Sequence, residues 1–185
     1  IETTGLTVGY DQILVIGLAD SSGARAYVAG RPEAGDETLD AFPAGLRGRR
    51  LLVSFNGINF DAPFIERHFK SAGLRLELPH LDLMLLARSL GIHGGLKDGV
   101  EPAVGIKRAA DIKEIRGNQA AQLWAQWKAG DAGAYRRLVS YCKADCTNLI
   151  GVADALYERR WAQVFGAHAR QVDFDALHGK QMSIF

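Results

Sequence analysis

Three acidic residues in short, distinctive segments are the residues of this sequence best suited to chemistry. Glu2 lies in IETTGL, Asp61 ends NGINFD, and Asp145 ends YCKAD. Carboxylate oxygens are the preferred ligands of hard cations such as Mg²⁺ and Mn²⁺. Each acid also has a plainer interpretation: Glu2 as a solvated terminal residue, Asp61 as a helix cap, and Asp145 as one of 21 acidic residues, most of them on the surface.

The surroundings of the acids favour the joint interpretation. Tyr141 and Asp145 are four residues apart, so a helix places both on one face. Asp61 follows an apolar run at 51–55 and the turn residues Asn56-Gly57, where the edge of a sheet presents side chains to a cleft. Glu2 would end the first strand. We therefore expect a strand, a loop and a helix to bring the three carboxylates to one divalent-cation site.

The elements that must position these residues can be predicted from apolar periodicity and turn chemistry. Apolar runs around Asp20-Ser21-Ser22-Gly23 predict a β-hairpin, and the run at 51–55 predicts a buried strand. Asp61 is expected to cap a helix that has Pro63 in its first turn and stops at Gly73. The remaining expectations are a short helix at 37–46 interrupted by Pro43, a strand at 80–82, a glycine-rich loop at 91–105, and helices at 83–90, 118–128, 132–142 and 145–164, of which the last two are continuous or consecutive.

This order predicts an α/β fold with a mixed central sheet of about five strands flanked by helices. Residues 1–165 would form one domain, and residues 166–185 a polar tail without periodicity. A length of 185 residues suits one domain, and 48% hydrophobic and 23% charged residues form an ordinary globular mixture. The formal net charge of +1 excludes no partner, since a nucleic-acid enzyme needs to be basic only along one groove.

Two cysteines are the only ones in the sequence, Cys142 and Cys146. Four residues apart on a helix they are poorly placed for a disulfide, and they are too few for a zinc site. We interpret them as reduced thiols of a cytoplasmic protein. No apolar run approaches the length of a membrane span, and no signal peptide is visible.

On its three acidic motifs the sequence resembles the DEDD superfamily of 3′→5′ exonucleases. The resemblance is to the tyrosine-bearing DEDDy branch and to ribonuclease-H-like domains of the YprB type, and it covers roughly Ile1 to Leu156. The family's motifs read Asp-x-Glu-Thr-Thr-Gly-Leu, Asn-Gly-x-x-Phe-Asp and Tyr-x-x-x-Asp. The first Asp of the family would immediately precede Ile1. Either the sequence omits it or the molecule lacks one metal ligand; we expect an omission, because IETTGL is otherwise intact.

The resemblance implies a ribonuclease-H-like fold and hydrolysis of phosphodiesters at a 3′ end by two Mg²⁺ or Mn²⁺ ions. In that scheme Glu2 and Asp145 bind one ion, Asp61 holds the second, and Tyr141 orients the attacking water. The residues implied to meet the terminal nucleotide are Thr3, Thr4, Gly5 and Leu6, and Asn56 would steady its loop or touch the substrate.

The C-terminal residues suggest a partner. Gln181, Met182, Ser183, Ile184 and Phe185 resemble the pentapeptide with which bacterial proteins dock on the DNA sliding clamp. This favours DNA over RNA as the substrate, and a role in repair or replication. The alternative is that Ile184 and Phe185 fold back on the domain.

Other interpretations of the whole chain stay open at this point. It could be a catalytically inactive nucleic-acid-binding module of the same fold, or an endonuclease or RNase using the same site. Four basic pairs are more often solvated than functional, although some could line a phosphate path: Arg49-Arg50, Lys107-Arg108, Arg136-Arg137 and Arg159-Arg160.

Overall fold

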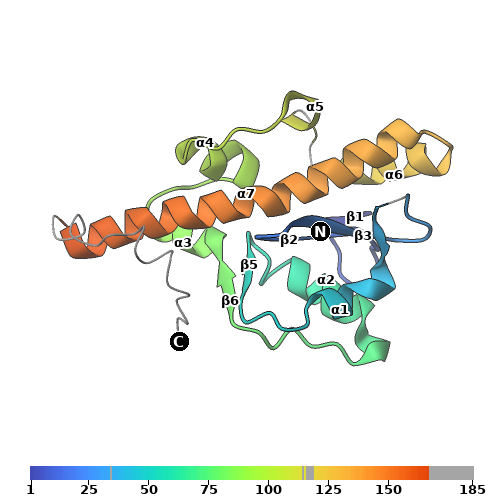
Figure 1. The fold of residues 1–185 in the computed structure, drawn as a ribbon, viewed down its shortest axis with the longest axis horizontal. Coiled ribbons are helices and arrows are strands. Elements are labelled where there is room, and N and C mark those ends of the chain that lie inside the picture. Colours follow the sequence, from blue (N-terminus) through green and yellow to red (C-terminus); the bar gives the residue numbers. More distant parts are fainter. Residues whose placement is uncertain (34, 114, 116–118, 167–185) are drawn as a thin grey trace.

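A long helix lies across a mixed β-sheet in the computed structural model, which describes residues 1–33, 35–113, 115 and 119–166 (Figure 1). Four strands form the sheet in the order β1-β2-β3-β4, antiparallel except for the parallel pair β3–β4. A second, parallel pair consists of β5 and β6. The strands are β1 (Glu2–Thr3), β2 (Ile13–Asp20), β3 (Gly23–Val28), β4 (Glu37–Thr38), β5 (Leu52–Ser54) and β6 (His80–Asp82).

The α/β class and the β2–β3 hairpin are confirmed, but the single sheet of about five strands is wrong. The strands divide into four and two, and a cavity lies between β2 and β5. Residues on both sides line that cavity, among them Gly17 of β2 and Val53 of β5. The strand predicted at 51–55 is confirmed as β5, but the prediction that it is buried is wrong, since Leu51 and Val53 are exposed.

The helices depart from expectation at two places. Residues 37–46 begin as β4, and Pro43 lies in the first turn of α1, where its missing N–H is not needed. The glycine-rich loop contains a π-helical turn, η3, and α4. Of the two alternatives for 132–142 and 145–164, the continuous helix is confirmed. The helical elements are η1 (Leu39–Ala41), α1 (Phe42–Gly45), α2 (Asp61–His68), η2 (Lys70–Ala72), α3 (Leu83–Ser89), η3 (Leu96–Val100), α4 (Glu101–Ala103), α5 (Ala110–Lys113), α6 (Ala120–Lys128) and α7 (Ala132–Phe165).

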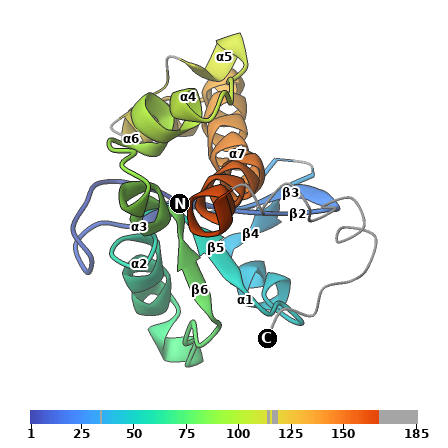
Figure 2. The same cartoon turned by 90° about the vertical axis from the view of Figure 1, so that its left-hand side faces the viewer.

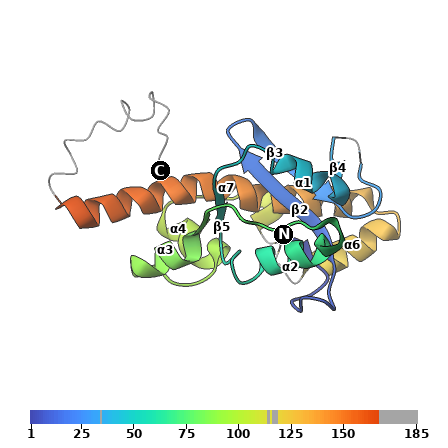
Figure 3. The ribbon, with the colours of Figure 1, turned by 90° about the horizontal axis from the view of Figure 1, so that it is seen from below.

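Helices cover both faces of the four-stranded sheet, as the end-on view along α7 shows (Figure 2). Alternate residues of β3 serve the two sides: Ala26 and Val28 pack with α6 and α7, whereas Tyr27 packs with α1 and α2. A third core joins α3 to the second half of α7 through Leu83, Val152 and other apolar side chains. The view from below shows α1 and α2 on the opposite side of the sheet from α7 (Figure 3).

A glycine brings α7 close to the sheet. A Cβ atom at Gly17 of β2 would lie 2.5 Å from the Sγ of Cys146 and 3.0 Å from the backbone oxygen of Cys142. The absence of a side chain therefore allows the helix to lie against β2 next to Asp145. Cys142 is buried, Cys146 is half-buried, and both are free thiols. In the described part of the chain, no helix has an apolar stretch long enough to cross a membrane.

Candidate active site

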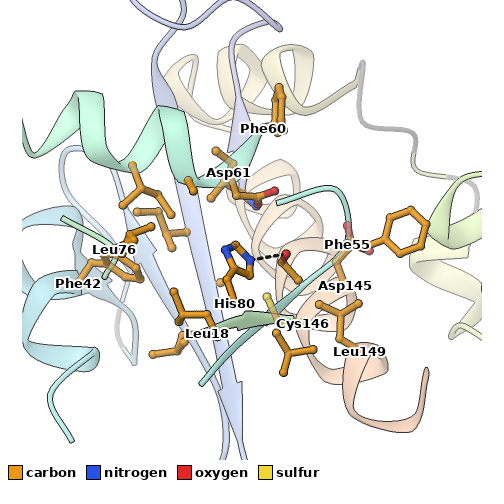
Figure 4. A pocket seen from close by; sticks show the side chains of 18 of the residues that line it. Leu18, Phe42, Phe55, Phe60, Asp61, Leu76, His80, Asp145, Cys146 and Leu149 are labelled. Atoms are coloured by element: carbon orange, nitrogen blue, oxygen red, sulfur yellow. Dashed lines mark hydrogen bonds and ion pairs between the residues drawn. The ribbon is translucent and has the colours of Figure 1, made fainter. Parts of the chain in front are cut away.

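The three motif acids come from three different elements and lie close enough to interact. Glu2 belongs to β1, Asp61 is the first residue of α2, and Asp145 lies in α7. The charges of Asp61 and Asp145 both act on Glu2. Asp61 and Asp145 also line the cavity between β2 and β5, from α2 and α7 respectively (Figure 4). The fold thus gathers the motifs at one place.

Glu2 is a buried acid, with only 5% of its surface exposed. Its pKa is raised from 4.5 to about 8, mainly by burial. The Ile1 ammonium and Arg108 act to lower this pKa, and the charges of Asp145 and Asp61 act to raise it. The neutral acid is therefore favoured until positive charge reaches the cluster. Carboxylate groups that repel one another in this way are suited to a divalent cation.

Asp61 starts α2 but does not cap it. The prediction of an N-cap is wrong by one residue, because Phe60 occupies the capping position and makes no side-chain cap hydrogen bond. The Oδ1 atom of Asp61 accepts a hydrogen bond of 2.8 Å from the Ile1 ammonium. Its carboxylate is thus directed toward the start of β1, and so toward Glu2.

A buried acid that the sequence analysis did not single out shapes the loop before Asp61. The carboxylate of Asp82 accepts hydrogen bonds from the backbone N–H groups of Asn56 at 2.8 Å, Ile58 at 3.2 Å and Met84 at 3.0 Å. Asn56 has a left-handed backbone, with φ at 60°. Asp82 therefore caps α3 and fixes the turn that leads to Asp61, with Asn56 as part of that turn.

Tyr141 and Asp145 lie one turn apart on α7, as the spacing predicted. Tyr141 is buried, and burial raises the pKa of its hydroxyl well above the usual value, so the hydroxyl stays protonated at neutral pH. Burial also raises the pKa of Asp145, while the positive charge of Arg108 opposes that shift. Oδ1 of Asp145 accepts a hydrogen bond from Nη1 of Arg108.

Arg108 and Glu101 form an internal ion pair that sequence reasoning missed. Their side chains are 4% and 2% exposed, and Nε and Nη2 of Arg108 donate to the two carboxylate oxygens of Glu101 at 2.7 and 2.6 Å. The Nδ2 of Asn148 adds a hydrogen bond of 2.9 Å to Glu101. The interpretation of the pair at 107–108 as solvated is therefore wrong for Arg108, although Lys107 is exposed.

The four residues that the family resemblance implies to contact a nucleotide differ in burial and in their hydrogen bonds. Thr3 is buried and donates to the backbone oxygen of Gly5, while Thr4 donates to the carboxylate of Asp11 at 3.0 Å. A Cβ at Gly5 would lie 2.5 Å from that same carboxylate, so this glycine admits Asp11. Leu6 is 82% exposed. Among these four residues, Leu6 presents its side chain most fully to solvent.

The donor set fits a divalent cation in its chemistry. Glu2, Asp61 and Asp145 supply the carboxylate oxygens that Mg²⁺ and Mn²⁺ prefer. Within residues 1–33, 35–113, 115 and 119–166, however, no three His, Cys, Asp or Glu side chains lie in positions that could hold an ion as they stand. As the side chains stand, Arg108 occupies one oxygen of Asp145.

A cavity of about 280 Å³ adjoins the acids. Its walls are mainly apolar, and Figure 4 shows Phe42, Leu76 and Leu149 around it. The ring of His80 makes a 2.7 Å hydrogen bond to Ser54, which joins β6 to β5 on one wall. The peptide Gln181–Phe185 lies outside the described residues, so its predicted docking role stays a prediction.

A sequence model of the RNase H superfamily matches residues 1–157 of the chain. Among curated proteins there is no match.

Proposed function

Because the chain belongs to the RNase H superfamily, we propose that it is a metal-dependent 3′→5′ exonuclease. Membership of this superfamily supports a nuclease function in general, without specifying the end at which the strand is attacked. The observation that carries the finer proposal is the approach of Glu2, Asp61 and Asp145 from three separate motifs to one place. Their order and neighbours are those of the DEDDy branch, whose members degrade nucleic acid from the 3′ end.

Glu2 and Asp145 would hold one divalent ion, and Asp61 the second. Two such ions lower the pKa of a bound water and stabilise the attacking and leaving oxygens of the phosphodiester. The protein itself would contribute by positioning the ions and the attacking water. Tyr141, protonated and buried beside Asp145, would hold the attacking water by a hydrogen bond from or to its hydroxyl.

The exposed Leu6 would pack against the terminal base, a contact that tolerates any sequence. Thr3, Thr4 and Gly5 would shape the backbone beneath that base. We propose DNA as the substrate in preference to RNA, because the peptide Gln181–Phe185 resembles a sliding-clamp ligand.

The deciding experiment is degradation of DNA and RNA strands that carry a label at either the 3′ or the 5′ end. The parent protein should release labelled mononucleotides first from the 3′-labelled strands, and only with Mg²⁺ or Mn²⁺. The Asp145→Asn variant keeps the shape of the side chain but removes the charge that holds the ion, so it should be folded and inactive. Full activity of Asp145→Asn would refute the mechanism.

A second candidate is a nucleic-acid-binding module without activity, and one observation favours it: in the described residues the acids are not in position to hold an ion. Tight binding of labelled strands without any degradation would support this candidate. Cleavage of a circular strand, which has no 3′ end, would instead indicate an endonuclease. The same assay with RNA separates an RNase from a DNase.

A further inference from the structure

A second pocket, of about 190 Å³, lies beside Tyr141 and Asp145. It differs from the apolar cavity in its walls, which carry two cationic side chains, Lys97 and Arg108. The guanidinium carbon of Arg108 lies 5.6 Å from the centroid of the Tyr141 ring, and the ammonium of Lys97 lies 5.7 Å from it. Positive charge is therefore held next to the residues proposed to carry the reaction. The remaining wall residues are Gly95, Leu96 and Asp98.

Arg108 is held there by a dedicated partner. Glu101 is 2% exposed and binds Nε and Nη2 of Arg108 at 2.7 and 2.6 Å, which fixes the plane of the guanidinium. Asn148 in turn holds Glu101 at 2.9 Å. Only Nη1 is directed to the acid cluster, where it contacts Asp145. A buried ion pair of this kind is weak evidence for stability, so a functional reason for its presence is worth seeking.

We propose that this pocket binds a phosphate group of the nucleic acid and that Arg108 makes the contact, positioned by Glu101. The inference rests on the proposed function and extends it to a residue outside the three motifs. When a divalent cation takes the oxygens of Asp145, Nη1 of Arg108 loses its partner and can donate to a phosphate oxygen. Charge-assisted hydrogen bonds from Arg to phosphate are strong, and exclusion of water strengthens them further.

The charges around the pocket make this binding dependent on the cation. Lys97 and Arg108 contribute two positive charges, while Asp98, Glu101 and Asp145 contribute three negative ones. A phosphate would thus meet net negative charge until a divalent cation neutralises Asp145. The expected order is cation first or both together, so phosphate affinity should rise with Mn²⁺ concentration.

The test is calorimetric titration of thymidine monophosphate into the full chain, with Mn²⁺ and without it. Arg108→Met should weaken binding by about tenfold to a hundredfold in Mn²⁺, the range expected for losing a hydrogen bond to a charged group. Lys107→Met, with the same loss of charge on the exposed neighbour, should stay within about twofold, since an exposed, screened charge contributes little. Arg108→Lys keeps the positive charge but not the planar guanidinium geometry. Its loss of affinity should therefore lie between those of Arg108→Met and Lys107→Met.

Thermal melts establish that each variant is folded, and if Arg108→Met is not, Arg108→Lys decides in its place. Unchanged affinity in the folded Arg108 variant would overturn the inference, and so would equal weakening by Lys107→Met. The positioning role of Glu101 predicts that Glu101→Gln raises KM for a DNA strand more than it lowers kcat. Because the titration measures binding, a chain that binds through Arg108 but degrades nothing refutes the exonuclease alone. A chain that degrades DNA while its Arg108→Met variant binds normally refutes this inference alone.

Discussion

Replacing Gly17 with alanine should separate α7 from β2 and thereby displace Asp145. The new Cβ would lie 2.5 Å from the Sγ of Cys146, whereas ordinary contacts lie at 3.4–4 Å, so the helix must move by about 1 Å. The backbone oxygen of Cys142, at 3.0 Å, prevents the strain from being relieved by a side-chain rotation alone. Overpacking of this kind costs about 1–3 kcal/mol. For a chain of this size that corresponds to a fall in Tm of about 2–12 °C.

The effect on catalysis should exceed the effect on stability. A misplacement of about 1 Å at a catalytic group can cost about a hundredfold in rate, and Asp145 directly precedes Cys146. The assays are thermal unfolding and release of mononucleotides from a 3′-labelled strand. Gly95→Ala is the matched control for the thermal melts alone, because Gly95 has an ordinary φ of −77° and nothing within 4 Å of its would-be Cβ. Its Tm should be unchanged or slightly higher.

A second substitution tests whether the clash with Cys146 is the cause. Cys146→Ala removes the Sγ atom, so the double variant with Gly17→Ala should recover part of the lost stability, with Cys142 still limiting the recovery. If Gly17→Ala melts like the parent and degrades DNA at the parent's rate, the close approach of α7 to β2 does not set the position of Asp145. If Cys146→Ala gives no recovery, the sulfur is not the obstacle.

Four further predictions concern other residues. Tyr141→Phe should lower kcat by about tenfold to a hundredfold and leave Mn²⁺ affinity unchanged in calorimetry, because it loses only the hydroxyl that orients water; equal loss of both would contradict this role. Burial raises the pKa of Glu2 from 4.5 to about 8, so the folded protein keeps a proton that the unfolded chain loses, and the metal-free stability should fall as pH rises through that window. Glu2→Gln should flatten that slope in melts between those pH values, and an unaltered slope would assign it to another group. Asp82→Ala should lower stability by about 2–4 kcal/mol in urea unfolding, since three backbone N–H groups lose their acceptor, and an unchanged midpoint would show that the turn holds without it. A chain ending at Lys180 should lose affinity for the bacterial sliding clamp in titrations, whereas equal binding by both lengths would dismiss the peptide.

Local sequence patterns predicted the helices and strands that are determined by neighbouring residues in the sequence. The β2–β3 hairpin follows from two apolar runs around a polar turn, and β6 passes into α3 as the His-Leu-Asp segment indicated. The one-turn spacing of Tyr141 and Asp145 also depends only on α7 being a helix. The division of the strands into two sheets could not be predicted, because it depends on which strands pair across the fold.

The polar residues that support the site were harder to predict for the same reason. Glu101 and Arg108 lie in a glycine-rich stretch, and basic pairs are usually solvated, so nothing local indicates burial. Asp82 was seen only as the end of a strand, although its carboxylate organises a turn 24–26 residues earlier in the sequence. The acids that would touch a metal are readable from motifs, while the side chains that position them become visible only in the fold.

Helix α7 is continuous from Ala132 to Phe165 and carries the third motif, Tyr141 to Asp145. At about 1.5 Å per residue its 34 residues extend about 50 Å, and it crosses the whole molecule (Figure 1). Val152 lies seven residues beyond Asp145, or about 10 Å along the axis, and is fully buried in the core beneath α3. Because α7 is unbroken between Asp145 and Val152, a shift of the helix at Val152 would also move Asp145. The hydrophobic core between α3 and α7 therefore helps to set the position of Asp145, and repacking that core would change this position from a distance.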